Sequence, residues 1–203
     1  QKVKMETEEI REKKEPKRLP VWACILLFAL GLFVCMGLYG TIGFGLLSLI
    51  LGDEARHPGL LVYTVTEANM LLSVLTPAVI LLYFERRPFS DLGLTLKGHV
   101  RGLWYGLLVA MLLYLIGFGL SLAIGEVEVT GFQFDPLNLL GTFVFCLLVA
   151  LTEEIMMRGY ILGRLLHTRM NKFLALFVSA LLFALLHIFN PNVAFLPMLN
   201  LVI

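Results

Sequence analysis

Residues 21–51 read VWACILLFALGLFVCMGLYGTIGFGLLSLIL and contain no charged side chain. A membrane-spanning helix needs about 20 mostly apolar residues, so this run is long enough to cross a bilayer with some tilt. The whole chain has the same character, because 59% of its 203 residues are hydrophobic and 15% are charged, against about 25% in a soluble domain. The composition predicts an integral membrane protein surrounded by the lipid bilayer, and it excludes a secreted, fibrous, disordered or nucleic-acid-binding protein.

Further apolar runs follow the first one along the chain. They cover residues 59–84, 102–124, 137 to about 163, 173–189, and a last run from 193 to the end of the sequence. The predicted fold class is all-α, a polytopic transmembrane helical bundle with at least six spans, the sixth truncated. We expect the natural chain to continue past both ends. In the first run, Gly37, Thr41 and Gly45 are spaced by four residues, which predicts close packing of that face against another helix.

The connections between the runs alternate in positive charge. The segments rich in Lys and Arg are residues 1–18, 85–101 and 164–172, which hold seven, four and three of them. The intervening segments 52–58, 126–135 and 190–192 hold at most one each. Loops rich in Lys and Arg stay in the cytoplasm. The distribution therefore predicts a cytoplasmic N-terminus, and it places the second and fourth loops in the cytoplasm as well.

All but four of the charged residues fall in segments that reach water, and the four exceptions are Glu67, Glu153, Glu154 and Arg158. An ionisable group inside a bilayer costs at least about 2.5 kcal/mol, so each is a functional candidate. Glu67 lies close to the outer end of its run, where an interfacial carboxylate is satisfied by water. Glu154 and Arg158 are four residues apart and are expected to pair on one helix face. Glu153 points about 100° away from Glu154 and has no such partner.

His187 is the one histidine within an apolar run. By itself it is typical of a packing residue, with Phe183 on the same helix face. Counted from the cytoplasmic ends at 1.5 Å per residue, Glu153 lies about 18 Å and His187 about 22 Å into the membrane on antiparallel neighbouring helices. The two side chains are therefore expected to meet. A carboxylate base and an imidazole can activate water and stabilise an oxyanion. No serine or cysteine has matching partners, and an HExxH motif is absent, so water is the expected nucleophile.

The motifs carry a family resemblance. The segment TEEIMMRGYILGRL at 152–165, the Phe183-x-x-x-His187 pair and the upstream FSDLGL at 89–94 together resemble the CAAX-protease and bacteriocin-processing family of intramembrane proteases, also called the CPBP or Abi family. They are similar to type II CAAX prenyl endopeptidases in particular. The resemblance covers roughly residues 89–203. It implies a membrane helical bundle whose catalytic cavity opens to the cytoplasm, with location in a bacterial cell membrane.

The resemblance also implies roles for individual residues. Glu153 would be the base that activates water, Glu154 and Arg158 would brace the site, and His187 would be a catalytic partner. Phe183 and Asn200 would be supporting or substrate-binding positions. The chain then divides into a charged cytoplasmic segment at 1–19, two N-terminal transmembrane helices at 20–85, and a family-like core at 86–203. The family has a later HxxxN or HxxxD motif, which we expect to lie beyond residue 203.

The expected function is hydrolysis of a peptide bond in a membrane-associated peptide or protein, which is prenylated for members related to the eukaryotic enzyme. No cofactor is favoured. A zinc ion held by Glu153, Glu154 and His187 is the alternative, although a helix discourages two neighbouring carboxylates from turning to one point. Other functions stay open. The chain could be a non-catalytic bacteriocin-immunity or peptide-binding protein, or a small proton-coupled transporter, and the lack of an inverted repeat counts against the transporter.

Overall fold

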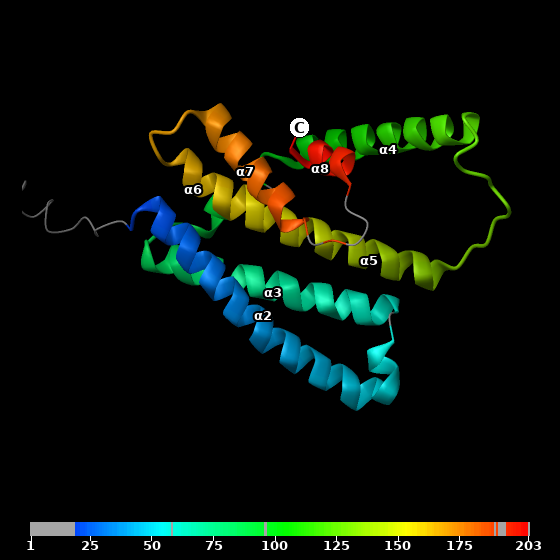
Figure 1. The fold of residues 1–203 in the computed structure, drawn as a ribbon, viewed down its shortest axis with the longest axis horizontal. Coiled ribbons are helices and arrows are strands. Elements are labelled where there is room, and N and C mark those ends of the chain that lie inside the picture. Colours follow the sequence, from blue (N-terminus) through cyan, green and yellow to red (C-terminus); the bar gives the residue numbers. More distant parts are fainter. Residues whose placement is uncertain (1–18, 58, 96, 189, 191–193, 203) are drawn as a thin grey trace, which may run out of the picture.

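The computed structural model describes residues 19–57, 59–95, 97–188, 190 and 194–202, and every regular element in these ranges is helical (Figure 1). Four helical stretches are long and apolar enough to cross a membrane, namely Val21–Arg56, Leu60–Phe84, Val100–Ala123 and Pro136–Leu166. This confirms the prediction of an all-α membrane protein. Six spans stay a prediction. The N-terminal charged segment and most of the turn at 190–192 lie outside the described residues.

The fourth long stretch is a continuous rod built from three elements. These are α5 at Pro136–Glu153, a π-helix labelled η3 at Glu154–Leu162, and α6 at Gly163–Leu166. α5 begins where the Asp135 carboxylate accepts the backbone N–H groups of Leu137 and Asn138, both at 3.1 Å. Pro136 occupies the first helical position, where its missing N–H leaves no bond unmade. The rod extends slightly beyond the apolar run predicted from the sequence.

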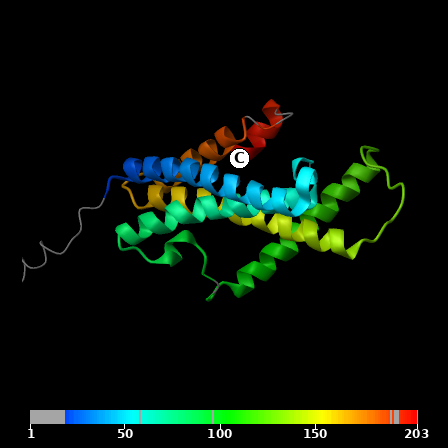
Figure 2. The same ribbon diagram turned by 90° about the horizontal axis from the view of Figure 1, so that it is seen from below.

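The other elements surround the rod unevenly. They are α2 at Val21–Leu51, η1 at Gly52–Arg56, α3 at Leu60–Phe84, η2 at Phe89–Leu92, α4 at Val100–Ala123, α7 at Lys172–Leu186 and α8 at Phe195–Val202. Figures 1 and 2 show α2, α3 and the rod side by side, with α7 crossing the rod from the other side. α4 stands apart from them, and none of its residues is buried. An apolar helix exposed all round is suited to lipid.

The buried core lies where α2, α3, η2, the rod and α7 converge. Its members are Phe28, Val74, Ala78, Leu81, Leu82, Leu92, Ile155, Met157, Tyr160, Ile161, Leu165 and Ala175. Because lipid tails are as apolar as these side chains, close packing rather than removal from water holds such helices together. Half of this core comes from 155–175, so the best-packed part of the chain lies between Glu153 and His187 in the sequence.

α7 is shorter than a helix that spans a membrane. Its 15 residues rise about 22 Å, short of the roughly 30 Å hydrocarbon core. The helix begins at Asn171, whose side chain accepts the Phe173 N–H at 2.8 Å, and His187 caps its C-terminal end. The short apolar run at 173–189 therefore predicted the location of this helix, which ends three residues earlier, at Leu186.

α2 and α3 approach each other at Gly31 and Gly43 of α2. The spacing of small residues by four instead predicts a contact at another face of this helix. A Cβ added to Gly31 would lie 2.7 Å from Cβ of Pro77, and one added to Gly43 would collide with the Asn69 amide. The predicted face at Gly37, Thr41 and Gly45 is wrong, because it is exposed and a Cβ on Gly37 or Gly45 would have nothing within 4 Å. Small-residue spacing marks a face that can pack closely, but the side chains of the partner helix decide which face is used.

The FSDLGL segment docks onto the rod at a glycine. The side chain of Leu92 is buried, and Gly93 takes a left-handed conformation, with φ of 76°, that ends the short η2 turn. A Cβ added to Gly159 would lie 2.6 Å from the carbonyl oxygen of Leu92, whereas one added to Gly163 would lie 3.6 Å from that of Asp91. The FSDLGL segment at 89–94 and the segment at 152–165 thus pack directly against each other.

We predict that Gly159→Ala destabilises the protein relative to Gly163→Ala. Both substitutions gain the same helix propensity of about 1 kcal/mol, but the new methyl at 159 must push backbone aside, which costs about 1–3 kcal/mol. Reversible unfolding in detergent micelles measures both. Equal stability of the two variants would contradict the docking of η2 on the rod.

Candidate active site

Glu153 and His187 meet in the structure. Glu153 is the last residue of α5, and His187 caps the C-terminus of α7. Glu153 Oε1 lies 3.6 Å from His187 Nε2, and the two side chains are 36% and 24% exposed. The sequence-based expectation that the two lie at one depth on neighbouring helices is met. The separation is longer than a direct hydrogen bond, and neither side chain is fully enclosed by protein.

The helix itself orients the His187 ring. Nδ1 lies 2.9 Å from the backbone oxygen of Phe183, one turn earlier. A carbonyl can only accept, so the proton is on Nδ1 and Nε2 faces Glu153. The Phe183 ring packs against the imidazole with a centroid distance of 4.5 Å. Phe183 therefore supports His187 with both its backbone and its ring.

Glu154 and Arg158 form the ion pair that their spacing predicts. Their side chains are 54% and 59% exposed, so the pair lies on an open face of the rod. Both residues belong to the π-helix η3. π-helical turns are rare and occur frequently at functional sites. Sequence periodicity gave no indication of this change in helix type.

The residues proposed as metal ligands do not converge. The Glu154 carboxylate is bonded to Arg158 instead of turning toward Glu153 and His187. Within the part of the chain that the structure describes, no group of three His, Cys, Asp or Glu side chains is placed to hold a metal ion. The described residues thus do not fit the zinc alternative. Asn200 lies exposed on α8.

A buried ion pair at one end of the rod was not predicted. Glu85 follows the last residue of α3, Arg164 lies in α6, and their side chains are 8% and 5% exposed. The prediction that both lie in loops that reach water is wrong for these two side chains. The signal that could have found Arg164 is the helical pattern, which continues past it to Leu166.

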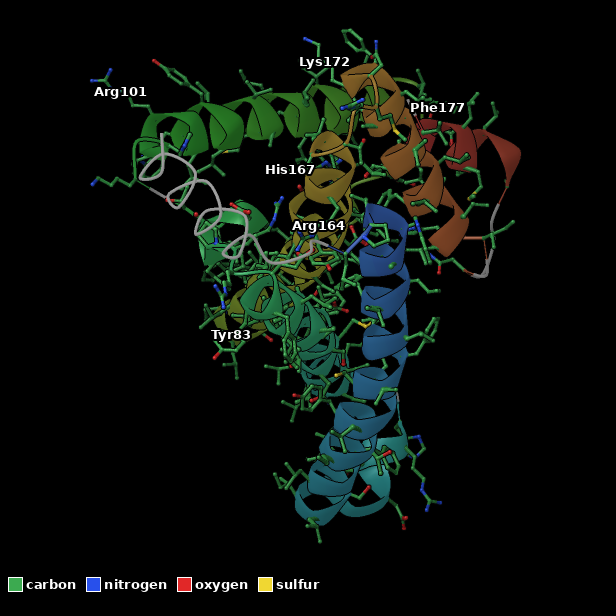
Figure 3. All side chains as sticks on the ribbon, turned by 90° about the vertical axis from the view of Figure 1, so that its left-hand side faces the viewer. Tyr83, Arg101, Arg164, His167, Lys172 and Phe177 are labelled. Carbon is green, nitrogen blue, oxygen red and sulfur yellow. The ribbon has the colours of Figure 1, made fainter. Side chains whose placement is uncertain are left out.

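The buried pair ties a third helix to the rod. Cys24 Sγ of α2 donates to Glu85 Oε1 at 3.1 Å, and the Tyr160 hydroxyl donates to the backbone oxygen of Cys24 at 3.4 Å. The Arg164 guanidinium lies 5.0 Å from the centre of the Tyr160 ring. Figure 3 shows Arg164 at the junction of these elements, while Arg101 and Lys172 extend outward. Polar contacts thus connect α2, α3 and the rod at this end.

The fold and the site define a helical membrane protein with a carboxylate–imidazole pair between two of its helices. Residues 135–203 match the family described as Type II CAAX prenyl endopeptidase Rce1-like. This segment starts at the residue that caps α5 and includes Glu153, Glu154, Arg158 and His187. The match supports membership of the CAAX-protease family and confirms the predicted resemblance over these residues, while 89–134 lie outside it. The family is one of proteases, so a hydrolase is supported at the family level. No curated protein and no solved structure matches the chain.

We predict that the two ion pairs differ strongly in their effect on stability. Glu85→Leu or Arg164→Met leaves a buried charge without its partner, which costs about 3–5 kcal/mol, whereas combining the two substitutions removes both charges and costs less. The matched changes Glu154→Leu and Arg158→Met in the open pair cost less, because neither charge is enclosed by protein. Double-mutant cycles of unfolding in micelles measure both couplings. Similar coupling energies would show that the pair at Arg164 is not a structural constraint.

Proposed function

We propose that this chain is an intramembrane endopeptidase that hydrolyses a peptide bond of a membrane-associated peptide or protein by glutamate-activated water. The observation that carries the proposal is the approach of Glu153 Oε1 to within 3.6 Å of His187 Nε2, with both side chains partly exposed. The family match to proteases over the same segment supports it. The substrate we propose is held at the membrane, either by its own apolar segment or by a prenyl group.

The early end of α7 supports the presence of water at this depth. Glu153 lies near the middle of the rod Pro136–Leu166, so the end of α7 beside it lies well inside the bilayer. The carbonyl groups of Phe183, Ala184 and Leu185 in its last turn accept bonds from His187 and Ile188, so the ionisable side chains there are those of Glu153 and His187. Ionisable side chains at membrane depth face the bundle interior or a water-filled cavity. A cavity at this position would provide the nucleophile for the reaction.

The proposed reaction uses only these two side chains and water. Glu153 removes a proton from water while the oxygen attacks the substrate carbonyl carbon, and a tetrahedral intermediate forms. Nε2 of His187 faces the developing oxyanion and donates a hydrogen bond to it when both ring nitrogens carry protons. The C–N bond then breaks, and Glu153 delivers its proton to the leaving amine. Glu154 and Arg158 brace the helix turn that follows the base, and no metal takes part.

We predict that Glu153→Gln and His187→Ala each reduce peptide cleavage on the order of 100- to 10,000-fold, because each removes an acid–base group. The assay uses purified protein in liposomes with fluorogenic peptides, one prenylated and one carrying an apolar segment. Cys146→Ala, an exposed change on the same rod, serves as the control and keeps full turnover. A zinc chelator leaves the rate unchanged. Wild-type turnover in Glu153→Gln would refute the mechanism.

We also propose the cytoplasmic orientation of the N-terminus and of the access to the site. It rests on the distribution of Lys and Arg among the loops. Cysteines introduced at the exposed positions Lys97, Glu128 and Arg169 test it with a membrane-impermeant maleimide. We expect only position 128 to react in intact cells and positions 97 and 169 to react in inverted vesicles. The reverse pattern would overturn the orientation.

A further inference from the structure

Ser179 is the single hydroxyl residue in the apolar helix α7 and makes an unusual bond. Its Oγ donates to the backbone oxygen of Met157 in η3 at 3.3 Å, and its side chain is buried, with 4% of the residue exposed. Serines and threonines in helices usually donate to a carbonyl one turn earlier in their own helix. Several hydroxyls of this chain do so, namely those of Thr41, Ser48, Thr64, Thr66, Ser73 and Thr152. Ser179 instead bonds to the neighbouring element.

This bond joins the same two elements that carry the candidate site. Met157 lies four residues after Glu153 on the rod, and Ser179 lies eight residues before His187 on α7. Met157 lies between Glu153 and Leu166 on the rod, and Ser179 lies between Lys172 and His187 on α7. The hydroxyl bond is therefore on the same side of the Glu153–His187 contact on both elements. Small buried residues, Ala175 and Ser179 among them, let α7 approach the rod closely. The hydroxyl bond then fixes how far α7 is shifted and rotated along that surface.

We propose that Ser179 is a positioning residue that sets His187 opposite Glu153. The proposal rests on the proposed function for its effect on catalysis, but the position of the two side chains can be tested separately. α7 is too short to be held at both membrane surfaces, so a lateral polar bond is what fixes its register. Met157 lies in the π-helix η3, a rare geometry that occurs frequently at functional sites. Ser179 supplies a donor at that point.

The first test separates turnover from substrate binding. Because displacement of a reacting group by about 1 Å costs up to about 100-fold in rate, we expect Ser179→Ala to lower kcat roughly ten-fold and to leave KM within about two-fold. Ser179→Thr keeps the hydroxyl, and its added methyl has room in the adjoining pocket of about 50 Å³, so it should restore most of kcat. Ser73→Ala, which removes an equally buried hydroxyl bonded within its own helix, should keep full kcat. Wild-type kcat in Ser179→Ala, or failure of Ser179→Thr to restore it, would overturn the proposal.

The second test does not depend on cleavage. Cysteines replace Glu153 and His187, a protease site is inserted between α6 and α7, and a short bifunctional methanethiosulfonate reagent joins the two positions. Retention of both fragments as one band on a gel measures their proximity, and each single-cysteine variant gives the background from the native cysteines. We expect Ser179→Ala to lower the cross-linking yield several-fold relative to Ser73→Ala. Equal yields would overturn the positioning role. Lack of wild-type cleavage together with a lower yield would refute the protease function alone.

Discussion

The ion pair between Glu85 and Arg164 is the constraint on which the arrangement of the bundle depends. Two opposite charges removed from solvent must face each other, because either one without the other is strongly unfavourable. The pair fixes the end of α3 against the end of the rod, and the Cys24 thiol adds α2 to the same point. The ion pair thus holds the rod in place at α6. The candidate site lies nearer the middle of the rod, at Glu153. Packing of Leu92 against Gly159 strengthens the anchor between these two regions.

Three carboxylates of similar chemistry take different environments along this part of the structure. Glu85 is buried and paired, so its charge is used for structure. Glu154 is paired with Arg158 on an open face of the rod, so its charge is used to hold that partner. Glu153 lies within 3.6 Å of an imidazole, and both groups can still be reached by a small molecule. Environment rather than residue type therefore distinguishes the candidate base from the two structural carboxylates.

Local properties of the sequence predicted much of this structure. Apolar run length located the long helices, and the i to i+4 spacing found the Glu154–Arg158 pair. Counting residues from the cytoplasmic ends of the two helices predicted that Glu153 and His187 lie close together. Other contacts between segments that are far apart in the chain could not be predicted from the sequence. Glu85 and Arg164 are far apart in the chain, and neither lies in an apolar context that marks it as buried. The choice of Gly31 and Gly43 for the contact between α2 and α3 depends on Pro77 and Asn69 of the partner helix.

The change of helix type and the shortness of α7 belong to one arrangement. A helix that crossed the whole bilayer beside the rod would cover Glu153 with apolar side chains and exclude water. α7 instead ends at His187, whose side chain lies beside that of Glu153 at this end of the helix. Such a polar end inside the bilayer requires protein partners or water, and it also requires that the shortened helix be held laterally. The bond from Ser179 to the π-helical Met157 meets that second requirement, because it places a polar attachment inside the apolar interface between the two elements.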